Sequence, residues 1–176
     1  MKKYSFKVLL LGAPAVGKTS ILYRYVKNQF SNDYITTIGL NYLTKDVNLD
    51  KKYLAKLVIW DIAGHEKFKF LRTQYYEGTQ GALVIFDLTR LKTYDELKHW
   101  LSEMFEIVKK RIPFVIIGNK IDLVEEVSRS VDYDIVRKFA ENNDSVYIET
   151  SAKTGENIEE AFTELTERMI KQGSKK

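Results

Sequence analysis

The chain of 176 residues contains no cysteine. Disulfide bonds, thiolate metal sites and cysteine nucleophiles are therefore excluded, and the composition suits a reducing cytosol. Long apolar runs are missing as well, since the longest are far too short to cross a bilayer. The first residues lead directly into a predicted strand, which argues against a signal peptide. With 44% hydrophobic and 30% charged residues and no repeat or break in composition, we expect a single globular domain over residues 1–176.

Charge of one sign is not concentrated anywhere in this sequence. The net charge is +4, which is only a weak indication of acidic partners. The lysines are scattered, whereas nucleic-acid sites cluster them. We therefore expect a solvated surface and no nucleic-acid partner.

Predicted strands and helices alternate along the chain. Short apolar runs at 82–86 and 114–117 are typical of central strands that are buried on both faces. Residues 39–47 and 53–60 predict two strands joined by a polar turn at 50–52, a spacing that favours an antiparallel hairpin at a sheet edge. This order predicts an α/β fold with one doubly wound, mostly parallel sheet, whose ligands bind at the carboxyl ends of the strands.

The last predicted helix carries both a start signal and an apolar stripe. Asn157 with Glu160 three residues later is the pattern of a capping box, so we expect Asn157 to cap the helix. The apolar residues that recur at helical spacing are Ile158, Ala161, Phe162, Leu165 and Met169.

The most informative segment is residues 12–19, which fit G-x-x-x-x-G-K-[ST] directly after the apolar run at 8–11. The backbone N–H groups of such a loop and the positive end of the following helix surround a phosphate chain. Lys18 adds a charge at the β- and γ-phosphates, and the Thr19 hydroxyl can ligate Mg²⁺. A chance match at a helix start is the less favoured alternative. The nucleotide-contacting residues predicted here are Ala15, Val16, Gly17, Lys18, Thr19 and Ser20.

A second segment follows the predicted strand at 53–60. Asp61 can hold Mg²⁺, directly or through water, opposite Thr19. Gly64 leaves room for its backbone N–H to approach a γ-phosphate. Alone, this pattern is more often a turn than a site, so its weight comes from following a phosphate loop one hairpin away.

Two further segments predict a guanine site. The carboxylate of Asp122 can accept hydrogen bonds from N1–H and N2–H₂ of guanine, a pair of donors that adenine lacks. Asn119 and Lys120 can brace this loop, with the Lys120 stem lying over the base, although a simple N-cap turn is the alternative. At the end of the last predicted strand, the backbone N–H of Ala152 can reach the guanine carbonyl. Its neighbours in this fourth segment are Ser151 and Lys153.

In this order and spacing, the four segments resemble those of the small GTPases of the Ras superfamily, and most of all its Rab branch. The resemblance covers about Tyr4 to Lys171, with residues 34–39 similar to a Rab switch I and residues 60–64 similar to W-D-T-A-G. It implies a six-stranded sheet with one antiparallel strand and five flanking helices. It also implies a molecular switch that binds GTP or GDP with Mg²⁺ and hydrolyses GTP. A phosphotransferase would leave residues 119–122 unexplained.

The resemblance also implies roles for individual residues. Thr37 would ligate Mg²⁺ and touch the γ-phosphate, Phe30 would stack on the guanine, and Tyr34 would close over the phosphates. The implied metal ligands are Thr19, Thr37 and Asp61, and the implied catalytic residues are Lys18, Thr37, Gly64 and His65.

Implied partners are effectors, a GTPase-activating protein and an exchange factor. Effectors would bind switch I (30–39), switch II (63–78) and an aromatic face. That face would consist of Tyr42, Trp60 and Tyr75 or Tyr76, for which sheet packing is an equal alternative.

The departures from the family pattern concern hydrolysis and anchoring. His65 stands where the family usually has the Gln that orients the attacking water, so we expect slow, partner-dependent turnover. The alternative is a GTP-binding scaffold with little useful hydrolysis. Pro14 stiffens the phosphate loop or hinders an arginine entering from a partner, and no arginine of this chain matches a built-in finger.

The sequence ends soon after its last predicted helix, without a prenylation cysteine, and has no N-terminal myristoylation glycine. Either the protein works without a lipid anchor or its native chain is longer. Lys171, Lys175 and Lys176 would add about 1 kcal/mol each of attraction to anionic lipid. We expect a cytoplasmic protein that is peripheral to membranes through its partners.

Overall fold

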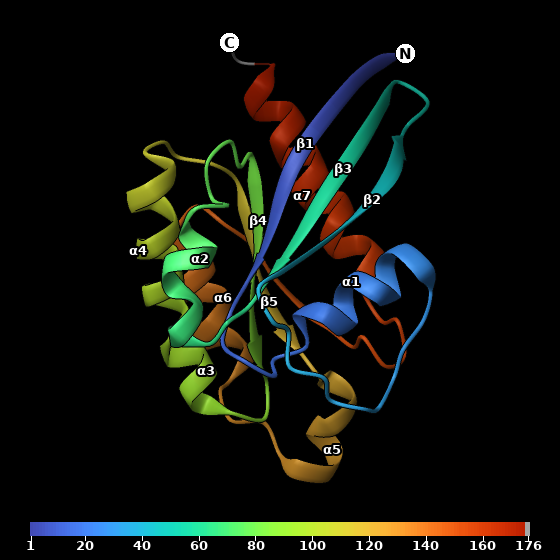
Figure 1. Cartoon of the computed structure of the whole chain (residues 1–176). Helices are drawn as coiled ribbons and strands as arrows, with labels where there is room; N and C mark the ends of the chain where they lie inside the picture. Colours follow the sequence, from blue (N-terminus) through green and yellow to red (C-terminus); the bar gives the residue numbers. More distant parts are fainter. Residues whose placement is uncertain (175–176) are drawn as a thin grey trace.

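Six strands form one mixed sheet in the order β2-β3-β1-β4-β5-β6 (Figure 1). The structure is a computed structural model that describes residues 1–174. Among the strand pairings of these described residues, only β2–β3 is antiparallel, and the other four are parallel. This confirms the predicted mostly parallel sheet with an antiparallel hairpin at its edge. The strands are β1 (Lys2–Leu11), β2 (Leu40–Leu49), β3 (Tyr53–Ile62), β4 (Gly81–Asp87), β5 (Phe114–Asn119) and β6 (Tyr147–Thr150).

The hairpin turn lies where the polar residues predicted it. Asp50 and Lys51 both adopt left-handed backbone angles, with φ of 48° and 56°, which matches the right-handed twist of the flanking strands. The Lys52 N–H closes the turn by donating to the Leu49 carbonyl at 3.0 Å. Each strand runs two residues beyond its predicted end, so β3 carries the chain as far as Ile62.

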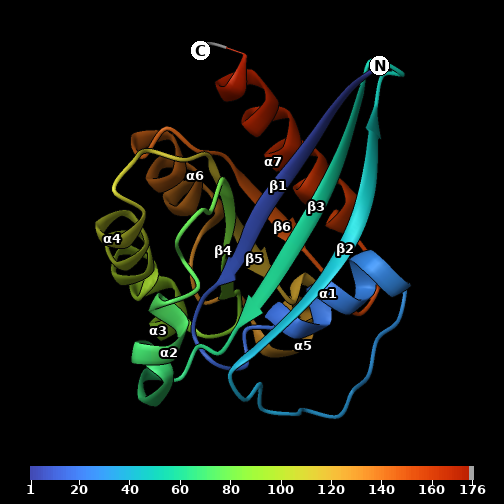
Figure 2. The ribbon, with the colours of Figure 1, turned by 45° about the horizontal axis from the view of Figure 1, so that its top comes forward.

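Helices cover both faces of the sheet (Figure 2). Residues 1–174 contain seven α-helical segments where the resemblance implied five helices, because Glu96 alone separates α3 from α4 and α5 is a single turn. None of these helices is both long and apolar enough to span a bilayer. Lys175 and Lys176 lie outside the described residues. The segments are α1 (Lys18–Lys27), α2 (Lys69–Thr73), α3 (Leu91–Asp95), α4 (Leu97–Val108), α5 (Val124–Val127), α6 (Tyr133–Asn142) and α7 (Ile158–Gly173), with 3-10 turns η1 (Glu66–Phe68) and η2 (Ile121–Leu123).

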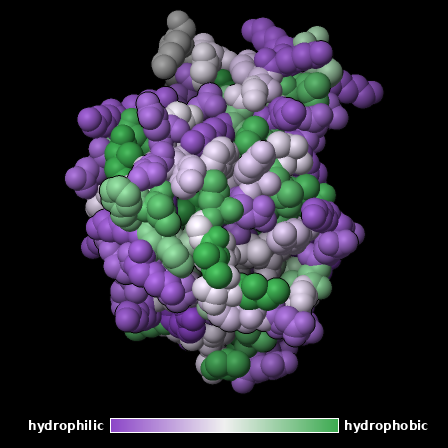
Figure 3. Space-filling model, in the orientation of Figure 1, coloured by the Kyte–Doolittle hydropathy of each residue, from purple (hydrophilic) through white to green (hydrophobic). Residues whose placement is uncertain are grey.

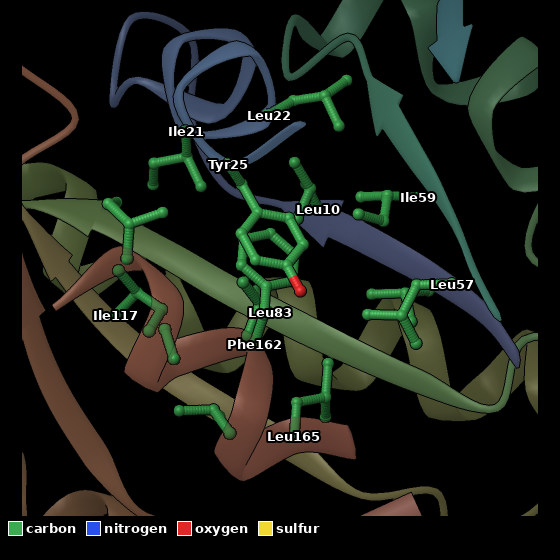
Figure 4. Packing of buried hydrophobic residues seen from close by; sticks show 14 of the residues in the cluster. Leu10, Ile21, Leu22, Tyr25, Leu57, Ile59, Leu83, Ile117, Phe162 and Leu165 are labelled. Atoms are coloured by element: carbon green, nitrogen blue, oxygen red, sulfur yellow. The ribbon is translucent and has the colours of Figure 1, made fainter. Parts of the chain in front are cut away.

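The core consists of two layers because successive residues of a strand face opposite sides. Leu10 packs with α1 and α7, whereas the neighbouring Leu9 packs with α4 and α6. At the centre of the first layer, the rings of Tyr25 and Phe162 stack with their centroids 3.8 Å apart (Figure 4). The apolar stripe predicted for the last helix is buried in this layer. The first layer fixes α1, whose residues Lys18, Thr19, Ser20 and Tyr23 line the site described below.

The capping prediction for Asn157 was wrong in its chemistry. Asn157 does precede α7, but its backbone is left-handed with φ of 56°, and its side chain makes no cap hydrogen bond. Instead, Nδ2 donates to the Glu149 carbonyl at 2.8 Å. Asn tolerates left-handed backbone angles better than most residues, so Asn157 can occupy the turn that leads from β6 into α7.

Candidate functional site

A cavity of about 990 Å³ lies at the carboxyl ends of the strands. All four motif segments contribute to its lining, which confirms that the topology brings them together. Two of the predicted residues, Val16 and Ser151, do not line the cavity and are fully buried. The predicted residues that line it are Ala15, Gly17, Lys18, Thr19, Ser20, Phe30, Tyr34, Thr37, Asp61, Gly64, His65, Asn119, Lys120, Asp122, Ala152 and Lys153.

The loop at 12–17 takes its shape from its two glycines. Gly17 has φ of 101°, and a Cβ there would lie 2.2 Å from Nδ2 of Asn119. Gly12 has φ of 149°, and its Cβ would lie 2.1 Å from the Ile85 carbonyl oxygen. Only glycine therefore lets the loop approach its neighbours this closely, and α1 begins immediately afterwards at Lys18.

The Lys18 ammonium is buried at the floor of the loop. It donates to the carbonyl oxygens of Gly12 at 2.8 Å and Ala13 at 2.9 Å. Burial lowers the pKa of Lys18 to about 8, although the nearby charge of Asp61 acts in the opposite direction. Burial deprives the Lys18 ammonium of stabilisation by water, and the negative charge of a polyphosphate bound beside it would replace that stabilisation.

Three oxygen-bearing side chains meet beside Lys18. The Thr19 hydroxyl donates to Oδ2 of Asp61 at 2.5 Å and lies 2.7 Å from Oγ1 of Thr37. Oδ1 of Asp61 is buried and has no hydrogen-bond partner among the described residues. Burial also raises the pKa of Asp61, against the opposing effects of Thr19 and Lys18.

These residues fit Mg²⁺, which prefers a few hard oxygen ligands and keeps several waters. An orphaned carboxylate oxygen in a buried site is the kind of atom that a cation satisfies. Among residues 1–174, no group of three or more His, Cys, Asp or Glu side chains is placed so that it could hold a metal ion. The hydroxyls of Thr19 and Thr37 are the side-chain oxygens beside Asp61 that could join it in a ligand set, with water and phosphate oxygens filling the other positions.

Gly64 and His65 border the cavity opposite the loop. A Cβ on Gly64 would lie 2.3 Å from the Gly12 carbonyl oxygen and 2.8 Å from Nζ of Lys18, so no larger residue fits without movement. His65 lines the cavity in an extended conformation, with φ of −67° and ψ of 136°, just before η1. The residue predicted to orient water thus directly follows the glycine that lies against the phosphate loop.

Asn119 joins three of the four motif segments. Its Nδ2 donates to the Val16 carbonyl at 2.9 Å, and its Oδ1 accepts from the hydroxyl of Thr150 at 3.0 Å. Oδ1 also accepts from the Ala152 N–H at 3.3 Å. Asn119 braces the loops as predicted, while contact between Ala152 and a guanine carbonyl stays a prediction.

The carboxylate of Asp122 has a fixed orientation. Its Oδ1 accepts a hydrogen bond of 2.6 Å from Oγ of Ser151, which ties the third motif segment to the fourth. Arg24 holds the fourth segment from α1 by donating to the carbonyls of Ala152 at 2.8 Å and Lys153 at 2.6 Å.

Asp87 supports the site through Lys120, and the sequence analysis did not identify it. It lies buried at the end of β4 and pairs with Nζ of Lys120 at 2.8 Å, while that same ammonium donates to the Ala15 carbonyl at 2.7 Å. Arg90 is near Asp87 and donates to the Pro14 carbonyl at 2.9 Å. The sequence feature that could have identified Asp87 is its position directly after the apolar run at 82–86, the same pattern that identified Asp61.

The aromatic residues divide between surface and core. Trp60 stacks on Tyr42 with ring centroids 5.4 Å apart, and Tyr75 lies tilted beside it at 5.6 Å. Tyr42 is 55% exposed. Tyr76 is fully buried, so its inclusion as an alternative member of a surface face was wrong. Its hydroxyl has a buried partner in Glu103, at 2.6 Å.

Comparison with known proteins supplies independent evidence. The model of the Ras family matches residues 7–171. The GTP-binding protein YPT1 of Saccharomyces cerevisiae is 38% identical over 169 residues, which cover 96% of this chain and 80% of that protein. Ras-related protein Rab-25 of Bos taurus is 40% identical over 172 residues, 98% of this chain and 79% of that protein. Ras-related protein Rab-21 of Homo sapiens is 40% identical over 169 residues, 96% and 74% of the two chains.

Proposed function

The chain belongs to the Ras family, and we propose that the cavity at the carboxyl ends of its strands is where it binds and hydrolyses GTP. As a Rab-like small GTPase, it is a molecular switch that binds GTP or GDP with Mg²⁺ and hydrolyses GTP to GDP and phosphate. We further propose that residues 1–176 form one G domain. The single sheet and the extent of the family match support this.

The observation that carries the site assignment is the meeting of Lys18, Thr19, Thr37 and Asp61 within one cavity. Lys18 and the loop N–H groups hold the β- and γ-phosphates. Mg²⁺, bound by Thr19, Thr37 and Asp61, would neutralise charge that develops on the phosphate oxygens. At the other end of the cavity, Asp122 accepts from the guanine edge while Ser151 holds it in place.

The hydrolytic step relies on positioning, because little covalent chemistry is left to the protein in phosphoryl transfer. Water attacks the γ-phosphate in line while the His65 imidazole holds that water through one nitrogen. Lys18 and the loop N–H groups stabilise the charge of the transition state. An imidazole offers a different hydrogen-bond geometry from a carboxamide, so intrinsic turnover is slow and a partner accelerates it.

The switch lies in two segments that contact the γ-phosphate. Thr37 belongs to the 30–39 segment, which has no regular helix or strand before Leu40, and Gly64 is the second residue of the 63–78 segment. When hydrolysis removes the γ-phosphate, both residues lose their contacts and both segments relax. Partners bind selectively to one of the two resulting surfaces.

Effectors, GTPase-activating proteins and exchange factors are the kinds of partner that the family uses. We propose that effectors bind the two switch segments together with Tyr42, Trp60 and Tyr75. Figure 3 shows apolar residues over α2 and beside it, with hydrophilic residues around them. Ile38, 81% exposed, and Phe70, 76% exposed, add apolar area to this surface. The protein would act in the cytoplasm and reach membranes through such partners.

Nucleotide competition tests the site assignment. The protein is loaded with a fluorescent GDP analogue, and GTP, ATP and XTP are each titrated against it with Mg²⁺. The proposal predicts displacement by GTP at a concentration at least about 100-fold below that of ATP, because a base without matching donors would leave the Asp122 carboxylate desolvated and unpaired. Equal displacement by ATP would contradict the assignment of a guanine site and would favour a phosphotransferase.

A second candidate function, a GTP-binding scaffold with little hydrolysis of its own, is favoured by His65 alone. It shares the whole binding site and differs only in turnover. Single-turnover hydrolysis, described at the end of the Discussion, separates the two.

A further inference from the structure

A buried ion pair joins the 63–78 segment to α4, and the GTP cycle described above leaves it without a role. Arg72 lies on α2 and is 1% exposed, and Glu103 lies on α4 and is 5% exposed. Nε and Nη2 of Arg72 donate to the two carboxylate oxygens of Glu103, each at 2.8 Å. The guanidinium also lies over the Trp100 ring, 4.7 Å from its centroid. Figures 1 and 2 both show α2 beside the α3–α4 side of the sheet.

The same guanidinium reaches the residue that borders the γ-phosphate position. Nη1 of Arg72 donates to the backbone carbonyl of His65 at 2.9 Å, and Nη2 donates to the Glu66 carboxylate at 3.2 Å. Farther along the segment, the Tyr76 hydroxyl donates to Oε1 of Glu103 at 2.6 Å. The Glu103 carboxylate on α4 therefore holds both ends of the 65–76 stretch: it binds Tyr76 directly, and it holds His65 through Arg72.

Glu103 remains charged in this setting. Burial raises its pKa, but the hydrogen bonds from Arg72 and Tyr76 and the charge of Arg72 outweigh burial, so its pKa is lowered. An arginine suits this position because its planar fork can hold a carboxylate with one edge and donate elsewhere with the remaining N–H groups. A lysine ammonium cannot span Glu103 and the His65 carbonyl in the same way.

Holding the His65 carbonyl has a geometric consequence. The orientation of that peptide group fixes ψ of His65, and Gly64 is packed against Gly12 and Lys18 on the other side. With both flanking peptide groups held, the Cα–Cβ direction of His65 is set, and with it the approach of the imidazole to the cavity.

We propose that Arg72, held by Glu103, is a positioning residue for His65 in GTP hydrolysis. The proposal rests on the water-orienting role assigned to His65 under Proposed function. Arg72 itself does not line the cavity, so it does not touch the reacting atoms, and its hydrogen bond to the His65 carbonyl is the contact through which we propose that it acts.

The test removes both charges at once, because deleting Arg72 alone would leave Glu103 as a buried unpaired charge. The double variant Arg72→Met/Glu103→Gln keeps similar volumes, and the amide oxygen that replaces the Glu103 carboxylate can still accept from Tyr76. A second variant, Arg72→Lys, keeps a positive charge beside Glu103 but loses the fork. The matched control is Arg168→Met/Glu164→Gln, which removes an ion pair of 2.7 Å within α7.

Each variant is measured by single-turnover hydrolysis of preloaded GTP, by GTP and GDP affinity, and by thermal melting. We expect the Arg72 variants to hydrolyse GTP about 10-fold to 100-fold more slowly, the scale of a small misplacement of a reacting group. Their nucleotide affinities should stay within about threefold of the wild type, and the α7 control should match the wild type in every measurement.

A cycle with His65→Ala then distinguishes positioning from general support of the fold. If Arg72 acts through His65, its substitution slows the wild type but leaves the already slowed His65→Ala protein unchanged. Equal slowing in both backgrounds would overturn the inference and leave the role of His65 intact. If His65→Ala alone does not slow hydrolysis, the role assigned to His65 fails first, which is a separate result. Should the double variant lose nucleotide binding, the cycle is read with Arg72→Lys.

Discussion

The Thr19 hydroxyl donates a hydrogen bond of 2.5 Å to Asp61, joining the first turn of α1 to the end of β3. Thr37, 18 residues farther along the chain, lies 2.7 Å from the same hydroxyl. Three separate segments thus meet at one point through oxygen atoms, and the second carboxylate oxygen of Asp61 is left without a partner among the described residues.

Asp61→Asn should weaken the dependence of nucleotide binding on Mg²⁺. The amide removes the negative charge that would attract the cation, while its size leaves the fold intact. We expect the Mg²⁺ concentration for half-maximal retention of GTP to rise at least about 10-fold. Nucleotide release at a series of Mg²⁺ concentrations measures it, with Asp46→Asn on the exposed edge strand as control. An unchanged Mg²⁺ requirement would contradict the ligand assignment.

Nucleotide binding should take up protons near pH 8. The pKa of Lys18 in the free protein is lowered to about 8, and a bound polyphosphate raises it because an anion favours the charged ammonium. At pH 8 about half of the free Lys18 is neutral, so binding takes up about 0.5 proton, and the uptake shrinks toward pH 7. Affinity therefore falls as pH rises through 8.

Calorimetry of GDP binding in buffers with different ionisation enthalpies measures this proton uptake. Zero uptake at pH 8 would mean that Lys18 is already fully charged in the free protein.

Asp122→Asn should change base specificity rather than abolish binding. The amide presents N–H₂ where guanine also presents N–H₂, so GTP affinity should fall about 100-fold or more. Xanthine carries a carbonyl oxygen at that position and should bind better to the variant than to the wild type. The competition titration described above reports both changes, and Asp134→Asn on exposed α6 serves as control. Parallel losses for GTP and XTP would indicate collapse of the loop instead.

Gly64→Ala should separate binding from hydrolysis. Its Cβ would come within 2.3 Å of the Gly12 carbonyl oxygen and 2.8 Å of Nζ of Lys18, so the 63–78 segment must move away from the phosphate loop. We expect GDP affinity within about 10-fold of the wild type and single-turnover hydrolysis slowed by about 100-fold. Gly173→Ala, with open space around its added Cβ, is the matched control. Hydrolysis at the wild-type rate would show that Gly64 need not approach the loop.

The fold and the centre of the site could be predicted because their signals are local. The phosphate loop is recognisable in eight consecutive residues, and Asp61 and Asn119 each stand where an apolar strand meets polar residues. Parallel topology then brings the ends of those strands together without further information.

Contacts between distant side chains could not be predicted in the same way. Arg72 and Glu103 are 31 residues apart, and each lies in a segment whose periodicity would allow it to face solvent. Tyr76 was placed on the surface as an alternative to Tyr75, because adjacent aromatic residues give no sign of which one turns inward. Asn157 was expected to cap α7, but a left-handed backbone redirected its amide to Glu149. Packing, rather than local pattern, decides these cases.

The most direct test of the central claim is single-turnover hydrolysis of preloaded GTP at 25 °C by the wild type and by His65→Gln, side by side. If His65 holds the attacking water but does so less well than a carboxamide, the wild type turns over slowly and the Gln variant faster. Equal turnover of the two proteins would contradict the claim that His65 limits intrinsic hydrolysis. A wild type that is nearly inert while the Gln variant is active would contradict the self-timed switch, and the protein would then be a GTP-binding scaffold or a switch whose cycle depends on a partner.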